Sequence, residues 1–272
     1  MNKMQKKIKE NKIDKTFKRL KSENKTAFIP FISIGDPDME TSLEIAKTLI
    51  KNGADIIELG FPFSDPMADG KVIQRSYERA LKNKISMEDA FNFIKRLKSF
   101  KDIPIIFFTY YNPVFILGEK FSEDASNAGI DGILVVDLPP EESYELTRYI
   151  KPKNIYQIYL LAPTTGKERM KQILSHANGF VYYVSVTGVT GARQSLPETI
   201  KSKVKEIKDI SSIPVGVGFG ISSKEQANDI GKSADAIIIG SKIIQFIEDN
   251  INDKKAIIQK IAEFSSDIKS GL

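Results

Sequence analysis

From residue 27 onward, the chain alternates short apolar runs rich in β-branched residues with longer stretches of helical periodicity. The eight runs are AFIPFISIG (27–35), DIIELG (55–60), IPIIFFTYY (103–111), DGILVVDLP (131–139), IYQIYLLA (155–162), FVYYVSV (180–186), IPVGVGFG (213–220) and ADAIIIGS (234–241). Strands this apolar must be covered on both faces, which is typical of parallel sheets. Eight strand–helix repeats predict an α/β fold, a closed TIM (β/α)8 barrel. An open, doubly wound sheet is the alternative.

The length of 272 residues suits one barrel, which takes roughly 250 residues. We find no Pro/Gly/Ser-rich linker, so we expect a single domain over 14–272 behind a lysine-rich N-terminal extension over 1–13. Extra helical segments are predicted at 14–22, against the barrel bottom, and at 254–268, along its side. A hydroxyl three residues before a glutamate, in 164–168 and 222–225, predicts two capping boxes.

Composition excludes several classes of site. The sequence has no cysteine and one histidine, His176, so disulfides, thiolate metal sites and multi-histidine centres are excluded and no metal is expected. Neither a membrane-length apolar run nor a signal peptide is present, which predicts a cytoplasmic protein, or a stromal one if the gene lies in an organelle.

The net charge of +5 comes from the first 25 residues, which hold ten Lys or Arg against three acids. We interpret this segment as a solvated, partly helical tail. The alternative, an arm for nucleic acid or another anion, lacks the interleaved aromatic residues that favour such binding. We therefore expect neither a nucleic-acid nor a membrane partner.

Three acids gather where the second strand ends, in ELGFPFSDPMADG (58–70). Barrel active sites lie at the carboxyl ends of the strands, and alternation along this strand points Glu58 into the mouth. Buried among apolar residues, Glu58 is a candidate general acid or base with a raised pKa. The structural alternative is a buried glutamate that backbone or hydroxyl groups satisfy.

The loop after Glu58 carries Asp65 and Asp69, and its prolines stiffen it. Asp69 is the better candidate for a second acid. For Asp65, a turn or an interface is expected. Either aspartate could instead make an Asx turn or cap a helix that begins near Lys71.

Glycines at the seventh and eighth strand ends predict a phosphate site. Gly216, Gly218 and Gly220 precede one helix, and Gly240 with Ser241 begins another. Free N–H groups at helix starts attract phosphate, and barrels commonly bind phosphate at these two strand ends. TGVTGARQSLP (187–197) is predicted to be a mobile lid, or else a plain surface loop.

Acid–base chemistry on a phosphorylated substrate remains after other reactions are excluded. Strands two to eight carry no lysine for a Schiff base, and histidines for a metal-dependent aldolase are missing. An apolar lining could hold an aromatic group or be plain core; its members are Phe31, Tyr110, Leu134, Tyr182 and Phe219.

The chain resembles the tryptophan synthase α subunit family. Members of this family are indole-3-glycerol-phosphate lyases. The resemblance covers nearly everything beyond residue 25 and rests most on ELGFPFSDPMADG. Other matching segments are FIPFISIGDP (28–37), YYNPVF (110–115), VSVTGVTGAR (184–193), GVGFGIS (216–222) and IIIGSKII (237–244).

The resemblance implies a cofactor-free retro-aldol cleavage of indole-3-glycerol phosphate to indole and glyceraldehyde 3-phosphate. It implies that Glu58 is the acid/base, that Asp69 bonds the indole N–H, and that Tyr182 lies near the substrate. The remaining implied residues are Gly191, Gly220, Gly240 and Ser241 for phosphate, Phe31, Tyr110, Leu134 and Phe219 for indole, and Thr190 in the lid.

The resemblance also implies a partner, a pyridoxal-phosphate-dependent β subunit in an αββα assembly. Asp65, Asn112 and Pro113 match positions that contact this partner. Two alternatives stay open here: a sugar-phosphate isomerase on the same fold, and a regulatory subunit whose barrel mainly activates the β partner.

Overall fold

The computed structural model describes residues 10–184, 196–218 and 220–272. Eight parallel strands pair in chain order, and β8 pairs with β1, so the sheet is a closed barrel. The strands are β1 (Ala27–Ser33), β2 (Ile57–Gly60), β3 (Ile105–Thr109), β4 (Gly132–Val135), β5 (Tyr156–Leu161), β6 (Val181–Val184), β7 (Val215–Gly218) and β8 (Ala236–Ile239). Each lies within one of the eight apolar runs, so the TIM barrel prediction is confirmed and the open sheet is wrong.

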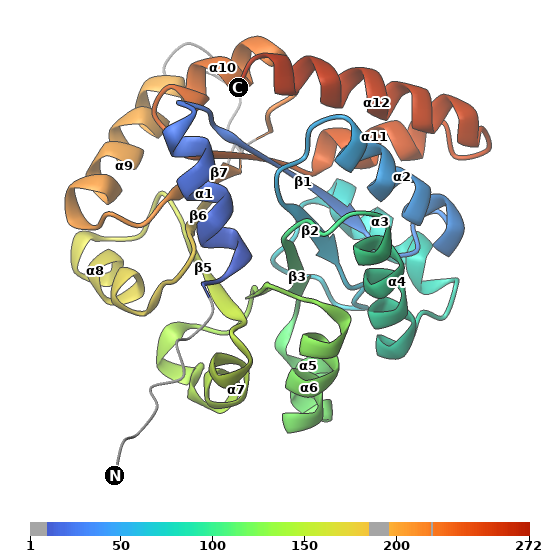
Figure 1. Cartoon of the computed structure of the whole chain (residues 1–272), viewed down its shortest axis with the longest axis horizontal. Helices are drawn as coiled ribbons and strands as arrows, with labels where there is room; N and C mark the ends of the chain where they lie inside the picture. Colours follow the sequence, from blue (N-terminus) through green and yellow to red (C-terminus); the bar gives the residue numbers. More distant parts are fainter. Residues whose placement is uncertain (1–9, 185–195, 219) are drawn as a thin grey trace.

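Helices surround the barrel, with α11 and α12 opposite α5 to α7 in Figure 1. They are α1 (Lys12–Ser22), α2 (Met39–Lys51), α3 (Lys71–Leu81), α4 (Met87–Phe100), α5 (Tyr111–Leu117), α6 (Glu119–Ala128), α7 (Tyr144–Ile150), α8 (Lys167–His176), α9 (Leu196–Ile210), α10 (Lys224–Gly231), α11 (Ser241–Asp249) and α12 (Lys254–Ser270), with 3-10 turns η1 (Pro140–Glu142) and η2 (Lys151–Lys153). In the described part of the chain, none of them combines the length and hydrophobicity needed to cross a bilayer.

The strand register decides which side chains face the barrel interior. Phe31 on β1 lies opposite Glu58 on β2, which lies opposite Ile106 on β3. Neighbouring strands in register point equivalent side chains to the same face. Glu58 therefore shares the interior with two apolar side chains, as its place in the strand predicts.

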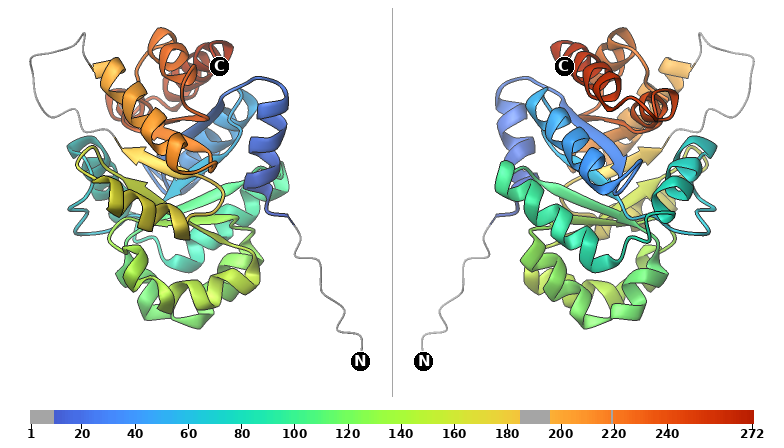
Figure 2. Two further views of the ribbon diagram at one scale, coloured as in Figure 1. Left: turned by 90° about the vertical axis from the view of Figure 1, so that its left-hand side faces the viewer. Right: turned by 90° about the vertical axis from the view of Figure 1, so that its right-hand side faces the viewer.

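Helix α1 covers the amino-terminal end of the barrel, outside the ring of the other helices (Figure 2). Its buried residues Ile13, Phe17 and Leu20 are 0%, 7% and 1% exposed. The ring of Phe17 lies 5.6 Å from that of Phe180, just before β6. This confirms the prediction that the first helix packs against the barrel bottom.

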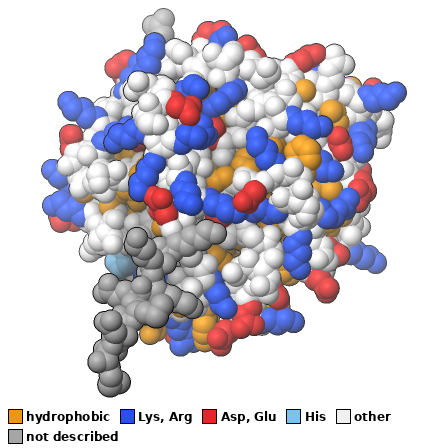
Figure 3. Space-filling model, in the orientation of Figure 1, with side chains coloured by type: hydrophobic (Ala, Val, Ile, Leu, Met, Phe, Trp, Pro, Cys, Tyr) orange, Lys and Arg blue, Asp and Glu red, His pale blue; other side chains and the backbone are white. Residues whose placement is uncertain are grey.

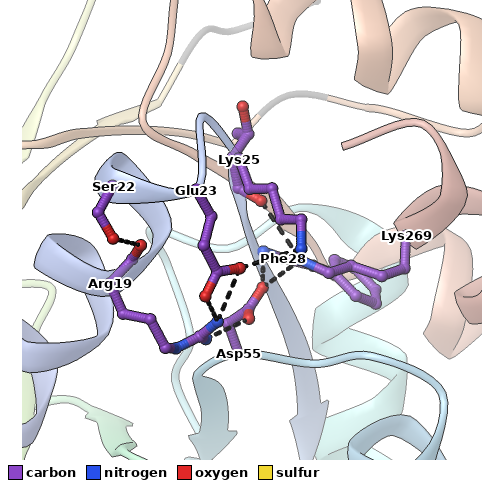
Figure 4. Close-up of polar contacts among 8 residues, drawn as sticks. Arg19, Ser22, Glu23, Lys25, Phe28, Asp55 and Lys269 are labelled. Atoms are coloured by element: carbon purple, nitrogen blue, oxygen red, sulfur yellow. Dashed lines mark hydrogen bonds and ion pairs between the residues drawn. The ribbon is translucent and has the colours of Figure 1, made fainter.

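Asp55 ties α1, β1 and α12 together at the same end of the barrel (Figure 4). Its carboxylate accepts a hydrogen bond from the backbone N–H of Phe28 at 2.9 Å and pairs with Lys269 at 2.6 Å and Arg19 at 3.1 Å. Because the carboxylate is nearly buried, these three contacts offset its loss of water. The first and last helices are thus joined through one side chain.

The cations of α1 largely have acidic neighbours. Lys12 pairs with Asp102, Lys18 with Glu10, and Arg19 with Glu23 as well as Asp55. On the face shown in Figure 3, blue and red side chains are interspersed. This is the arrangement of a solvated helix rather than of an uninterrupted anion-binding stripe.

The start of the packed structure lies slightly before the expected domain boundary. Asn11 caps α1 by accepting from Ile13 N, and its amide donates to the carbonyl oxygens of Asp131 and Asn154 at 2.9 and 2.7 Å. The division into an extension over 1–13 and a barrel over 14–272 stays a prediction. Residues 1–9 lie outside the described residues.

The two predicted capping boxes are wrong in detail. Helix α8 has Gly166 as its N-cap, and the Thr165 hydroxyl instead accepts from Ala162 N at 3.0 Å. Helix α10 is capped one residue later than expected, by Ser223, whose side chain accepts from Gln226 N. In both segments neighbouring hydroxyl residues compete for the cap, and spacing alone does not choose between them.

We expect Ile13→Ala to lower the free energy of unfolding by about 2–5 kcal/mol, because it leaves a cavity beneath the barrel. Urea unfolding measures the change. Lys15→Ala, on the exposed face of the same helix, is the control and should stay within about 0.5 kcal/mol of the wild type. An Ile13→Ala protein as stable as this control would contradict the packing role of α1.

Candidate active site

Glu58 is buried at the carboxyl end of β2. Its side chain is 1% exposed, and its Oε1 atom has no hydrogen-bond partner among the described residues. No ion pair of Glu58 is found in that part of the chain either. The structural alternative, a glutamate satisfied by surrounding polar groups, is therefore not supported at Oε1. An unpaired buried carboxyl group is costly, which marks a candidate functional group.

Asp69 lies at the end of the loop that follows β2, and it does not cap α3. The N-cap of α3 is Gly70, so α3 has no side-chain capping hydrogen bond. Asp69 Oδ2 instead accepts a hydrogen bond from the Tyr110 hydroxyl at 2.7 Å, and that hydroxyl accepts from Ala68 N at 3.0 Å. Tyr110 also stacks on Phe63, with ring centres 4.7 Å apart. These contacts attach the acidic loop to the end of β3.

The two acids have raised and different pKa values. Burial, together with the nearby charge of Asp69, raises the pKa of Glu58 to about 8. Burial raises the pKa of Asp69 to about 6, although the hydrogen bond from Tyr110 works in the opposite direction. At neutral pH the favoured state has Glu58 protonated and Asp69 ionised. The site then holds one proton donor and one negative charge, as acid–base catalysis requires.

Phe31 forms an apolar floor between the acids and the eighth strand. Its ring packs edge-on against Phe108, with centres 5.2 Å apart. A Cβ atom on Gly60 would lie 2.6 Å from the Phe31 ring, and one on Gly240 would lie 3.2 Å from it. Gly60 is therefore needed for the ring to lie where it does, whereas a side chain at position 240 would displace the ring by only a few tenths of an ångström. Leu134 is fully buried one strand further on, in register with Phe108.

Tyr182 lies on the opposite side of the barrel interior, on β6. A Cβ atom on Gly218 would lie 2.2 Å from its ring, so Gly218 makes room for this tyrosine. Burial and the charges of Glu58 and Asp69 raise the pKa of Tyr182 well above its ordinary value. The tyrosine therefore stays a neutral hydroxyl close to both acids.

The ends of β7 and β8 lead into helix starts, as the glycine pattern predicts. Gly240 is the N-cap of α11, which begins at Ser241, and Gly220 lies in the turn before α10. Gly220 and Ser241 are exposed, and Gly240 is half-buried. Free N–H groups at the start of α11 are suited to an anion.

Three expected site residues lie outside the described residues: Thr190, Gly191 and Phe219. Strands β1 to β4 and β6 bring six other expected residues to one end of the barrel. They are Glu58, Asp69, Tyr110, Tyr182, Phe31 and Leu134. Asp65 and Asn112 are exposed, and Pro113 is half-buried. These three belong to the loop after β2 and to α5, beside the mouth and not within it.

Comparison with known proteins identifies the family. The family model for the tryptophan synthase alpha chain matches residues 17–272. The tryptophan synthase alpha chain of Nitrosomonas europaea is 47% identical over 240 residues, which are 88% of this chain and 87% of that one. The crystal structure of the alpha subunit from Legionella pneumophila is 38% identical, with a TM-score of 0.89, over 96% of this chain and 98% of that one.

The chain belongs to the tryptophan synthase alpha chain family. It is a lyase of tryptophan biosynthesis, and its reaction is the cleavage of indole-3-glycerol phosphate. A chain of tryptophan synthase from M. tuberculosis has the same fold, with a TM-score of 0.85 and 30% identity over 96% of this chain and 98% of that one. The sugar-phosphate isomerase alternative is therefore wrong.

Two features of this α-chain site escape the sequence pattern. Tyr110 was expected only as part of the indole pocket, whereas its hydroxyl bonds Asp69. Tyr77 on α3 is fully buried, with its hydroxyl unpartnered among the described residues. The spacing of Ile73, Tyr77 and Ala80 predicts a buried helix face, but spacing cannot show that a hydroxyl has no partner.

We expect Glu58→Gln to stabilise this α chain more at pH 8 than at pH 5. The pKa of Glu58 is raised from 4.5 to about 8 in the folded chain, so the native state binds more protons between those values. Its stabilising contribution is complete below pH 4.5 and is lost as the pH rises through 8. Replacement should remove this loss, which amounts to about 3 kcal/mol between pH 5 and 8.

Urea unfolding of both proteins at pH 5 and pH 8 measures this difference. Glu78→Gln, which changes an exposed carboxylate on α3, is the matched control and should show the same offset from wild type at both pH values. An offset for Glu58→Gln that does not change with pH would show that Glu58 titrates normally.

Proposed function

We propose that this chain cleaves indole-3-glycerol phosphate by a retro-aldol reaction in which Glu58 is the acid/base and Asp69 stabilises the positive charge of the ring. The observation that carries this assignment is the pair itself: Glu58 is buried with an unpartnered oxygen, and Asp69 is bonded by Tyr110 in the neighbouring loop. The raised pKa values of Glu58 and Asp69 support this proposal, because they favour one bound proton in the pair at neutral pH.

Glu58 begins the reaction as a neutral acid. It donates its proton to C3 of the indole ring, which converts the ring to a cationic indoleninium. The resulting Glu58 carboxylate removes the proton of the side-chain hydroxyl next to the ring. That oxygen becomes the aldehyde, the C–C bond breaks, and its electron pair neutralises the ring. Glu58 ends protonated, so no proton is gained or lost.

Asp69 acts as the fixed negative charge. The positive charge on the ring is shared with the indole nitrogen, and a carboxylate that accepts the N–H hydrogen bond stabilises it. The Tyr110 hydroxyl donates to Asp69 Oδ2 at 2.7 Å, and Oδ1 has no protein donor among the described residues. One oxygen is thus held by the protein, and the other is suited to the substrate.

The rest of the site fixes the two ends of the substrate. We assign the phosphate to the start of α11 at Gly240 and Ser241, with Gly220 beside it, because free N–H groups there suit an anion. Phe31, Tyr110 and Leu134 supply apolar surface for the ring, and Tyr182 a neutral hydroxyl. The proposal also includes Gly191 as a phosphate contact, Phe219 as a residue of the indole pocket and Thr190 as a residue of the lid.

We further propose that a β subunit with pyridoxal phosphate receives the indole, as in an αββα assembly. This chain itself needs only proton transfer, so no cofactor of its own is proposed. An exposed apolar surface lies beside Asp65, Asn112 and Pro113: Met67, Phe115 and Ile116 are 86%, 66% and 73% exposed. Large apolar side chains this exposed are the kind of surface that an interaction site offers. We expect the complex to act in the cytoplasm, or in a stroma if the gene is organellar.

We expect Glu58→Gln and Asp69→Asn each to lower kcat for indole release at least about 100-fold, since each removes acid–base or charge stabilisation. Circular dichroism should show an unchanged fold. Asp65→Asn, in the same loop but exposed, is the matched control and should turn over normally without the partner. Near-wild-type turnover of Glu58→Gln would overturn the assignment of this residue.

We expect Phe115→Ala to weaken binding of a β subunit at least about 10-fold without changing turnover of the isolated chain, because it removes exposed apolar contact area. Calorimetric titration with a β subunit measures the affinity. Phe100→Ala is the control, since Phe100 is also exposed, at 40%, but lies at the end of α4. Equal affinities for the two variants would place the interface elsewhere.

A further inference from the structure

Tyr77 combines complete burial with an unsatisfied hydroxyl. Its side chain is 0% exposed, and its Oη atom has no hydrogen-bond partner among the described residues. A buried hydroxyl without a partner costs free energy that phenylalanine, which has the same ring, would not. The packing of α3 therefore does not explain why a hydroxyl is present at this position.

The Tyr77 hydroxyl reaches the site from α3, although the helix itself lies outside the barrel. A Cβ atom on Gly60 would lie 2.9 Å from Tyr77 Oη and 2.6 Å from the Phe31 ring. Gly60 follows Glu58 by two residues on the same strand, so both face the interior. The charges of Asp69 and Glu58 both act on the Tyr77 hydroxyl, which is consistent with this place.

The Phe31 ring relates this hydroxyl to the phosphate end of the site. The Cζ end of the ring lies toward Gly60 and Tyr77, and its Cδ1 edge lies toward Gly240. A substrate that extends from the acids to the start of α11 must pass along this ring. The Tyr77 hydroxyl therefore lies beside the end of such a ligand that is nearer the acids, where the glycerol chain joins the indole ring.

Helix α3 is held firmly enough to place a hydroxyl. Arg79 makes two bonds of 2.8 Å to the buried Asp36 carboxylate, and the Ser76 hydroxyl bonds that of Ser33 at the end of β1. Arg75 binds Glu248 of α11 at 2.6 and 2.9 Å. These contacts tie α3 both to β1 and to the helix whose start we assign to phosphate. Positioning of this kind is what a specific polar contact needs.

We propose that Tyr77 hydrogen-bonds a hydroxyl group of the glycerol chain of the substrate and so selects a hydroxylated chain between the indole ring and the phosphate. This inference rests on the proposed function and adds a residue to it. A phenol can donate and accept, and the glycerol chain offers hydroxyl groups that do the same. Sites built to bond a substrate hydroxyl discriminate strongly against analogues that lack it.

The test compares two ligands in wild type and Tyr77→Phe. The first is indole-3-glycerol phosphate, for which kcat/KM is measured. The second is indole-3-propanol phosphate, which keeps the ring and the phosphate but lacks both hydroxyls, and its Kd is measured by calorimetry. Tyr183→Phe is the control, because Tyr183 is equally buried but alternates with Tyr182 and faces the helices.

We expect Tyr77→Phe to lower kcat/KM for indole-3-glycerol phosphate about 5- to 10-fold, the effect of one lost hydrogen bond. Its Kd for indole-3-propanol phosphate should stay within about 2-fold of the wild type, and its melting temperature should equal or exceed that of the wild type. Tyr183→Phe should change neither the kcat/KM for indole-3-glycerol phosphate nor the Kd for indole-3-propanol phosphate. The deciding quantity is the fold-loss in kcat/KM for indole-3-glycerol phosphate compared with the fold-change in Kd for indole-3-propanol phosphate. This comparison holds even if the variant is less stable.

Equal losses for both ligands would overturn the proposal, because Tyr77 would then act through packing. Unchanged kcat/KM for indole-3-glycerol phosphate would overturn it as well. Failure of the wild type to cleave indole-3-glycerol phosphate would be a different result, because it would refute the proposed function before Tyr77 is considered.

Discussion

Hydrogen bonding between β8 and β1 closes the sheet, and this closure determines which residues can meet. Eight parallel strands that end on one rim bring residues more than 180 positions apart, such as Glu58 and Gly240, to the same interior. The strand register decides which side chains point inward, and these pack against one another so closely that water is excluded from them. A carboxyl group placed there must hold its proton, and the chemistry of the site follows from that requirement.

The two acids divide their tasks because their surroundings differ. Glu58 is enclosed by apolar side chains and has an unpartnered oxygen, whereas Asp69 lies on a loop and accepts a hydrogen bond from Tyr110. The first environment favours the neutral form and the second restores part of the stability of the ion. At neutral pH one carboxyl group is thus protonated and the other ionised. The mechanism proposed here uses this difference and no metal ion.

The sequence was sufficient to predict the barrel, the eight strands and the inward direction of Glu58, because period-two alternation and apolar runs depend on local pattern alone. It also predicted that α1 would pack beneath the barrel. It failed where partners come from distant segments: Tyr110 reaches Asp69 across 41 positions, and nothing local signals that bond. The capping errors at Thr165 and Ser222 have another cause, since adjacent hydroxyls offer nearly equivalent caps. The roles of individual site residues stay predictions.

Gly60 has a consequence for how this site can change over generations. The space its missing side chain leaves is shared by the tip of Phe31 and the oxygen of Tyr77. A Cβ atom at position 60 would lie 2.6 Å from Phe31 and 2.9 Å from Tyr77, so a mutation to alanine there requires both neighbours to become smaller or to move. Positions 31, 60 and 77 should therefore evolve as a linked triplet, in which the order of replacements matters more than the identity of any one of them.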